Sequence, residues 1–480
     1  MTIHQNFIAG EWAKAQAAGP NINPSDLKDV IGEYARATRA DAEAAIAAAK
    51  AASYGFARSN PQARYDALMM ISNEITARKD ELGKLLSREE GKTLIEGVGE
   101  TVRAAQIFSF FAGEALRISG EKVTSTRPGV DVEITREPVG VVSIITPWNF
   151  PIAIPAWKIA PALAYGNCVV FKPADLVPGC AFALAEIIAR SGLPKGVFNL
   201  VMGRGSEIGE TLLTHPDVNA ISFTGSVATG RKVAQAAVGA SVMKKVQMEM
   251  GGKNPLIVLD DADMKTAVDC AANGAFFSTG QRCTASSRLV VTQGIHDKFV
   301  DALTERIKAL VVDDALKAGT HIGPVVDQSQ LDQDLRYIKV GKDEGAKLHW
   351  GGELLNRDKQ GFYLQPALFT GVDNKMKIAR EEIFGPVASV IRVKDYEEAK
   401  TVANDTDFGL SSGICTTSLK YASDFKRNSE AGMVMVNLPT AGVDYHVPFG
   451  GRKGSSYGPR EQGRYAVEFY TSVKTSYTLP

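Results

Sequence analysis

Between Val141 and Asp260, short β-branched segments alternate with helical segments, and this alternation restricts the possible folds more than any other feature of the chain. Each β-branched segment is followed by glycine, proline or polar turn residues before the next helical pattern begins. This order is typical of a parallel sheet with helices packed on its faces. The expected strands are Val141–Thr146, Cys168–Lys172, Phe198–Val201, Ala220–Phe223 and Lys245–Met248.

A second alternating region follows and predicts a second α/β domain. Its expected strands are Asn254–Leu259, Ser287–Thr292, Ala388–Val393 and Met433–Asn437. Earlier in the chain, the alanine-rich stretch from Arg39 to Arg117 has apolar residues three and four positions apart, which predicts helices. After Gly120, alternation of threonine and valine with two turn signals predicts a hairpin of strands ending near Glu137.

The stretch 141–171 is mostly apolar and is longer than the ~20 residues that a bilayer span needs. Four prolines interrupt it, and Asn149 and Lys158 lie inside it. A continuous helix facing lipid would therefore be strained and would bury polar groups. We predict instead a buried strand, a loop, and then a helix from about Ala156 to Ala164, and no membrane association.

Charge and cysteine content restrict the class of protein. Lysine plus arginine equals aspartate plus glutamate, 54 of each, and no long run of one sign occurs, which argues against a nucleic-acid partner. The five cysteines include no CxxC pair, and the six histidines have no metal-ligand spacing, so we expect no metal site. The first residues lack a basic segment followed by an apolar one, so we expect a cytoplasmic protein.

Ligands of parallel sheets bind beyond the carboxyl ends of the strands, so the residues there carry the most functional information. Lys172 can donate hydrogen bonds to ribose hydroxyls, and Asp175 can accept them. The loop 223–230 can present backbone amides to a pyrophosphate where a helix begins. Neither this loop nor 203–209 fits a GxGxxG or P-loop motif, and each glycine taken alone can be an ordinary turn residue.

Cys283 lies in the sequence Gly280-Gln281-Arg282-Cys283-Thr284. A thiol can add to a carbonyl carbon and later leave it, which divides a difficult oxidation into two easier steps. A single buried cysteine is more often a small apolar core residue. The surrounding motifs therefore decide how Cys283 is interpreted.

Six motifs together resemble the aldehyde dehydrogenase superfamily, in the order found there and across nearly the whole chain. They are Thr146-Pro147-Trp148-Asn149-Phe150-Pro151, Phe223-Thr224-Gly225-Ser226, Glu249-Met250-Gly251-Gly252-Lys253, Gly280-Gln281-Arg282-Cys283, Glu381-Glu382-Ile383-Phe384-Gly385-Pro386 and Pro448-Phe449-Gly450-Gly451. The segment 438–463 resembles the branch of the superfamily that oxidises 2-oxoglutarate semialdehyde (2,5-dioxopentanoate). Ser455-Ser456 stands there in place of the more usual Ser-Gly.

The resemblance implies an α/β fold with two doubly wound domains and a small β flap used for oligomerisation. The cofactor-binding domain, which is Rossmann-like, would comprise 1–118 and 138–250, and the catalytic domain 251–448. The flap would comprise 119–137 and 467–480, with 449–466 returning to the cofactor domain. An exposed flap edge needs a partner strand, so we expect a homodimer or homotetramer.

The resemblance also implies a mechanism. Cys283 would attack the aldehyde, while the Asn149 side chain and the Cys283 backbone N–H would stabilise the resulting oxyanion. Glu249 would activate the water that hydrolyses the thioester, which favours a free acid over an acyl-CoA product. Lys158 and Glu461 would belong to a proton relay. The residues expected to bind the cofactor are Trp148, Lys172, Asp175, Gly205, Gly225, Ser226, Glu382 and Phe384.

We expect NAD as cofactor, with NADP tolerated because Asp175 is one methylene shorter than the glutamate common in the family. For the substrate we expect a short semialdehyde bearing a carboxylate. Relatives that oxidise succinic semialdehyde often have arginine where Trp157 stands, and Arg282 is a possible substitute, or else forms a salt bridge to a neighbouring domain. A broad-range aldehyde dehydrogenase with an apolar mouth formed by Trp157, Phe110 and Phe111 is the alternative. A catalytically silent binding protein is a further one.

Overall fold

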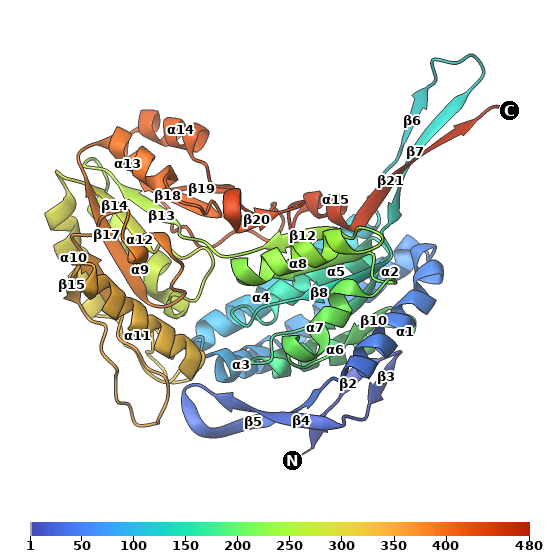
Figure 1. Ribbon diagram of the computed structural model, residues 1–480, viewed down its shortest axis with the longest axis horizontal. Helices are drawn as coiled ribbons and strands as arrows, with labels where there is room; N and C mark the ends of the chain where they lie inside the picture. The colour runs from blue at the N-terminus through green and yellow to red at the C-terminus, as the bar shows by residue number, and fades with distance from the viewer. Residues whose placement is uncertain (1) are drawn as a thin grey trace.

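Residues 2–480 are described by a computed structural model, in which two α/β units are joined by extended N-terminal and C-terminal segments (Figure 1). The strands form an eight-stranded sheet, a seven-stranded sheet and two three-stranded sheets. One large apolar core surrounds the eight-stranded sheet, and two smaller ones cover the faces of the seven-stranded sheet. The expected α/β fold with two doubly wound parts is confirmed, whereas the domain boundaries given above stay predictions.

The eight-stranded sheet has the order β20-β12-β11-β8-β9-β10-β2-β3, and its five central strands are parallel. The central strands are buried on both faces, as expected for near-continuous runs of β-branched residues. They confirm the five predicted strands to within one residue at either end. The strands are β8 (Val141–Ile145), β9 (Cys168–Lys172), β10 (Phe198–Leu200), β11 (Ala220–Thr224), β12 (Lys245–Glu249), β2 (Asn6–Ile8), β3 (Glu11–Ala13) and β20 (Ser456–Tyr457).

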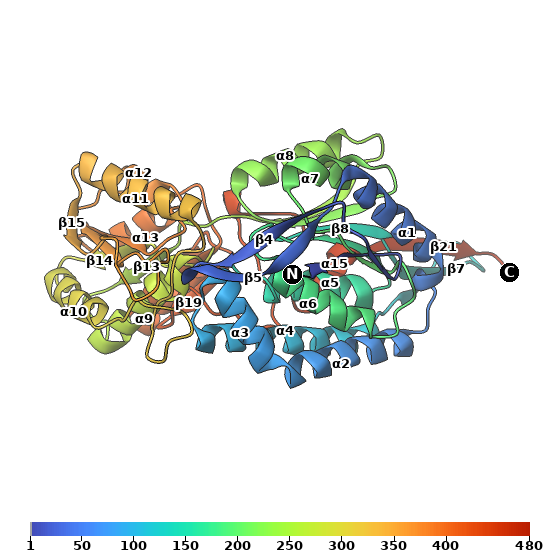
Figure 2. The ribbon, with the colours of Figure 1, turned by 90° about the horizontal axis from the view of Figure 1, so that it is seen from below.

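Helices cover both faces of this sheet, as Figure 2 shows, with α7 and α8 on one side and α5 and α6 on the other. The chain proceeds from β8 outward through β9 and β10 and then returns to β11 on the opposite side of β8. This reversal opens a crevice between the ends of β8 and β11, which is the usual ligand site of such sheets. The helices are α5 (Ala153–Ala164), α6 (Pro178–Ala189), α7 (Gly205–Thr214) and α8 (Val227–Gly239).

Helix α5 begins at Ala153, three residues before the predicted start, and Pro161 lies inside it. All twelve of its residues are buried, which explains why the stretch 141–171 is so apolar without crossing a membrane. No helix within residues 2–480 is long and apolar enough to span a bilayer. The predicted helices upstream are confirmed as α1 (Arg39–Ala57), α2 (Pro61–Ala77), α3 (Lys79–Glu90) and α4 (Leu94–Ala115).

The seven-stranded sheet has the order β15-β16-β17-β14-β13-β18-β19. Its strands are β13 (Pro255–Val258), β14 (Arg288–Thr292), β15 (Lys347–Trp350), β16 (Ala367–Thr370), β17 (Val387–Val393), β18 (Ser411–Cys415) and β19 (Met433–Val436). Four of these were predicted, whereas β15, β16 and β18 were not. The associated helices are α9 (Met264–Phe276), α10 (His296–Lys308), α11 (Gln328–Asp343), α12 (Lys377–Arg380), α13 (Tyr396–Asn404) and α14 (Leu419–Asn428).

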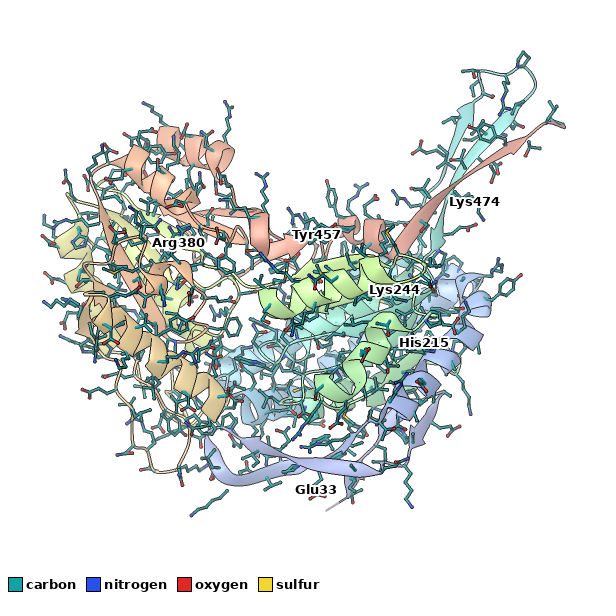
Figure 3. The ribbon with its side chains drawn as sticks, in the orientation of Figure 1. Glu33, His215, Lys244, Arg380, Tyr457 and Lys474 are labelled. Atoms are coloured by element: carbon teal, nitrogen blue, oxygen red, sulfur yellow. The ribbon has the colours of Figure 1, made fainter. Side chains whose placement is uncertain are left out.

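Two small sheets complete the structure. Strands β1 (Ile3–His4), β4 (Ala17–Asn23) and β5 (Asp26–Arg36) form a long N-terminal arm that the sequence did not predict. The tip of this arm contacts the second unit, where Leu27 N–H donates to the Gln360 carbonyl at 2.9 Å. The predicted hairpin is β6 (Glu121–Thr124) and β7 (Asp131–Pro138), and the last strand, β21 (Thr471–Thr478), follows the short helix α15 (Val467–Tyr470) and pairs with β7. This flap projects from the body and carries Lys474 (Figure 3).

Candidate active site

A cavity of about 1040 Å³ occupies the crevice between β8 and β11. Most of the residues expected to bind the cofactor line it, although they come from loops far apart in the sequence. These are Trp148, Lys172, Gly205, Gly225, Ser226, Glu382 and Phe384. Asp175 lies instead in an adjoining cavity of about 500 Å³, next to the same strand end.

The two helix N-termini at this cavity suit a dinucleotide diphosphate. Helix α7 begins at Gly205, and a β-carbon built on Gly205 or Gly209 would meet almost nothing, so open space lies over both. Helix α8 begins after Ser226, whose side chain caps the helix by accepting from the Thr229 N–H. Free backbone amides at helix N-termini attract phosphate, so the residues present fit the diphosphate of NAD or NADP.

Lys172 and Asp175, the two residues predicted to contact a ribose, lie at and just beyond the carboxyl end of β9. Burial lowers the pKa of Lys172 to about 8, and its Nζ donates to the Pro173 carbonyl at 2.8 Å. Asp175 is partly exposed, and its carboxylate lies 3.9 Å from the Arg204 guanidinium. No motif in the sequence distinguishes Arg204, and its guanidinium places a positive charge beside the Asp175 carboxylate.

Glu382, Phe384 and Trp148 also line the larger cavity. Glu382 accepts the Gly252 backbone N–H at 2.8 Å, and burial raises the pKa of its carboxyl to about 7. Phe384 adopts a left-handed backbone conformation with φ of 64° and meets the Trp148 ring edge-on at 5.3 Å. A non-glycine residue with positive φ is uncommon, and such residues cluster at ligand sites.

Cys283 lies where this cavity meets a second one of about 340 Å³ and lines both. The chain reaches it through a kink in which Ser278, Thr279 and Gly280 all have positive φ. A β-carbon on Gly280 would lie 2.2 Å from the Gly385 carbonyl oxygen, so the kink requires glycine there. Burial raises the pKa of the Cys283 thiol, and the carboxylates of Glu382 and Glu249 raise it further. Both effects favour the protonated form of the resting thiol.

The Asn149 side chain is buried beside the loop that carries Cys283. Its amide donates to the Gln281 backbone carbonyl at 3.0 Å, and its own backbone carbonyl accepts from the Lys92 ammonium. One amide hydrogen is therefore used to hold the side chain in place. The second remains available to a substrate oxygen.

Glu249 lies in a buried cluster with Ser456, Lys158 and Glu461. The Ser456 hydroxyl donates to its carboxylate, and Lys158 donates both to Glu461 and, at 2.9 Å, to Ser222. Burial raises the pKa of Glu249 well above its usual value, and Glu461 raises it further, whereas Ser456 and Lys158 lower it. The predicted water activator and the two predicted relay residues are thus brought together.

Comparison with known proteins identifies this arrangement. Residues 12–476 match the model of the aldehyde dehydrogenase family. The chain belongs to this family. It is therefore an oxidoreductase enzyme. The chain is 45% identical to the alpha-ketoglutaric semialdehyde dehydrogenase of Bacillus subtilis (99% of the chain and 98% of the relative) and 42% identical to the alpha-ketoglutarate semialdehyde dehydrogenase of Haloferax volcanii (98% of each).

A crystal structure of betaine aldehyde dehydrogenase from Staphylococcus aureus in complex with NAD⁺ superimposes on this aldehyde dehydrogenase with a TM-score of 0.96. The two chains are 35% identical, and the alignment covers 99% of this chain and 94% of the other. No three histidine, cysteine or acidic side chains within residues 2–480 gather as a metal site would require.

The second cavity of this aldehyde dehydrogenase contains both tentative substrate residues. Trp157 lines it and stacks on Phe449 at 5.4 Å. Arg282 lines it as well, but its guanidinium lies 3.0 Å from the Glu96 carboxylate and also donates to Ser278 and Asn273. Because Glu96 belongs to α4 of the other unit, the geometry favours the salt bridge between domains over a free carboxylate binder.

The apolar mouth expected for a broad-range enzyme is not formed by Phe110 and Phe111. Phe111 is fully buried in the main core, and Phe110 packs against Tyr445 at 6.3 Å. Neither ring lines either cavity that Cys283 borders.

Arg103, on α4, lines the second cavity and was not found by sequence reasoning. Arginine within a helical pattern ordinarily lies on a solvated face, so nothing in the local sequence distinguishes it. Only the fold brings it into one cavity with Cys283.

Proposed function

We propose that this enzyme oxidises a short aldehyde bearing a carboxylate, such as 2-oxoglutarate semialdehyde, to the corresponding acid, with NAD as electron acceptor and NADP tolerated. The observation that carries the proposal is the position of Cys283, which opens on a dinucleotide-sized cavity on one side and a smaller cavity on the other. The names of the two relatives support the choice of substrate, and the NAD⁺ complex of the structural neighbour supports the cofactor.

In the first half-reaction, the sulfur of Cys283 forms a bond to the aldehyde carbon, and the carbonyl oxygen takes up the negative charge. The free amide hydrogen of Asn149 and the Cys283 backbone N–H donate to that oxygen. NAD bound in the larger cavity would supply the acceptor for the hydride that the same carbon releases. The substrate is then a thioester of Cys283.

Because the resting thiol favours its protonated form, Cys283 must lose its proton before or during attack. Two carboxylates raise the pKa of the thiol by their charge, Glu382 more than Glu249, and either is a candidate acceptor of this proton. In the second half-reaction, Glu249 removes a proton from water, the hydroxide adds to the thioester carbon, and the carbon–sulfur bond breaks. The Lys158–Glu461 pair can take that proton onward through the buried cluster.

We further propose that the enzyme assembles as a homodimer or homotetramer and acts in the cytoplasm. An outer edge of the projecting flap carries exposed Val473 and Tyr477 on β21, which supports a homodimer or homotetramer. All five cysteines are free thiols, which supports a reducing compartment such as the cytoplasm.

A comparison of kcat/KM for 2-oxoglutarate semialdehyde and for hexanal, each with NAD and with NADP, tests the proposal. We expect a preference of at least about tenfold for the semialdehyde, since an ionic contact made in the transition state contributes more than ~1.4 kcal/mol. The broad-range alternative is favoured by the aromatic wall of Trp157, Phe449 and Phe150 in the second cavity. A preference for hexanal would establish it.

A further inference from the structure

We propose that Arg103 is the residue that binds the carboxylate of the substrate and thereby selects acidic aldehydes. The inference rests on the proposed function and deepens it by naming the group that recognises the substrate. Among residues 2–480, no carboxylate lies within ion-pair distance of the Arg103 guanidinium, although this group lines the second cavity.

The other charged side chains that line this cavity are already paired. Lys92 lies 2.8 Å from Glu100, whose second oxygen accepts two backbone N–H groups of the loop leading into α5. Arg282 lies 3.0 Å from Glu96. Arg103 is the one remaining cation among the described residues of the cavity wall, so the cavity has an excess of one positive charge.

The Arg103 guanidinium is held in place on two sides. One terminal nitrogen donates to the side-chain oxygen of Gln462 at 3.2 Å, and the guanidinium lies over the Trp157 ring at 5.6 Å. Its Nε is buried and has no hydrogen-bond partner in the structure. A planar guanidinium with unused donors matches a carboxylate in bidentate fashion, and a partner would satisfy a buried donor that otherwise costs stability.

The position relative to Cys283 suits a short semialdehyde. Both residues line the same cavity, and the thiolate form of Cys283 would raise the pKa of Arg103. Burial lowers the pKa of Arg103, while Glu100 and Asp444 raise it, but arginine stays protonated throughout. The aldehyde carbon can therefore lie at the thiol while the carboxylate at the other end of the same short chain meets the guanidinium.

The test compares wild type, Arg103→Met and Arg103→Lys on 2-oxoglutarate semialdehyde and on hexanal. We expect the ratio of kcat/KM for the two aldehydes to fall by about 30- to 100-fold in Arg103→Met, mostly through KM. Arg103→Lys should give an intermediate ratio, because an ammonium keeps the charge but lacks the two parallel N–H donors of a guanidinium. Competitive inhibition by 2-oxoglutarate provides a second measurement, and its Ki should rise in Arg103→Met.

Asp444→Asn is the matched control, because Asp444 is an exposed carboxylate whose charge also acts on Arg103. Its removal should leave the ratio at or above the wild-type value. The proposal is overturned if Arg103→Met lowers kcat/KM equally for both aldehydes and so leaves their ratio unchanged. It is also overturned if Asp444→Asn lowers the ratio as much as Arg103→Met is expected to. Failure of the proposed function is separate, since it would appear as a preference of the wild-type enzyme for hexanal.

Discussion

Ser456 donates a hydrogen bond from its hydroxyl to the carboxylate of Glu249. The same hydroxyl oxygen accepts the backbone N–H of Gly451 at 2.6 Å, so its orientation is determined from the other side. The contact exists because β20 pairs antiparallel with β12, which sets Ser456 opposite Glu249. A hydrogen bond donated to a carboxylate favours its ionised form, and Ser456 therefore opposes the effect of burial on the pKa of Glu249.

Replacement of Ser456 by alanine should narrow the pH range over which the enzyme is active. Without the hydroxyl, the pKa of Glu249 rises further above its usual value, because the largest cause, burial, is opposed by one group fewer. Glu249 works as a base only when ionised, so the acid limb of the steady-state pH–rate profile should move to higher pH. A profile of kcat against pH for both enzymes measures the shift.

Tyr457→Phe is the control for this variant, because it removes a hydroxyl from the neighbouring residue, which is 58% exposed and is labelled in Figure 3. Its pH profile should match that of the wild type. An acid limb that stays in place in Ser456→Ala would show that the hydroxyl has no part in the ionisation of Glu249.

Replacement of Glu249 by glutamine should separate the two half-reactions. Because Glu382 remains to accept the proton of the thiol, acylation would still produce about one NADH per active site, whereas steady-state turnover should fall by about 10²- to 10⁴-fold because the base that activates water is lost. Rapid mixing with detection of NADH measures the burst. Cys283→Ala should remove both burst and turnover, and wild-type turnover in Glu249→Gln would exclude this carboxylate from hydrolysis.

The buried pair of Lys158 and Glu461 should contribute strongly to stability. Lys158→Met leaves an uncompensated buried carboxylate, so the free energy of unfolding should fall by about 3–5 kcal/mol in urea denaturation. The double variant Lys158→Met/Glu461→Gln should recover part of that loss, because no charge is left unpaired. Lys195→Met, which breaks an exposed pair with Glu11, should change the free energy of unfolding little. Equal losses in Lys158→Met and Lys195→Met would show that burial does not make the Lys158–Glu461 pair more important for stability.

The pairing of Asp175 with Arg204 should determine how well NADP is tolerated. Arg204→Ala removes the positive charge that a 2′-phosphate would meet, so kcat/KM for NADP should fall by about tenfold with little change for NAD. Asp175→Asn should raise kcat/KM for NADP, because it removes a carboxylate that repels the 2′-phosphate. Steady-state kinetics with both cofactors measures the ratio, and equal effects on NAD and NADP would place Arg204 outside the cofactor site.

Two acidic substitutions on the flap should disrupt assembly. Val473→Asp with Tyr477→Asp places charges on an exposed edge strand where a partner subunit would pack. Light scattering after gel filtration should then show a smaller species. Tyr54→Asp, at an exposed position on α1, is the control, and an unchanged mass in the flap variant would exclude this surface as the interface.

Local patterns in the sequence predicted the part of the fold in which they are strongest. The strands β8 to β12 follow from runs of β-branched residues, and the helices α1 to α4 follow from apolar spacing. Strand β18 was missed because Ser-Ser-Gly-Ile-Cys consists mostly of small residues, which become strand only when buried between β13 and β19. The N-terminal arm was missed because its strands depend on contacts with distant segments.

For the candidate site, motifs predicted which residues would lie close together but not which hydrogen bonds and ion pairs each of them would form. Arg282 was singled out by its place beside Cys283, yet its partner Glu96 lies 186 residues away in the sequence. Ser456 was noticed as a departure from the family pattern, but its contact with Glu249 depends on strand pairing across 207 residues. Pairing partners of charged groups are set by tertiary structure, and no local pattern encodes them.

Two adjacent residues, Glu461 and Gln462, serve the two sides of the site. Glu461 accepts a hydrogen bond from Lys158 and Gln462 accepts one from Arg103, and Gln462 has a left-handed backbone conformation with φ of 58°. Attempts to evolve a new substrate preference should therefore avoid position 462, where a substitution would also disturb the adjacent Glu461 and its pair with Lys158. Arg103 lies on a separate helix, so selectivity can be redesigned there while the steps common to all substrates are preserved.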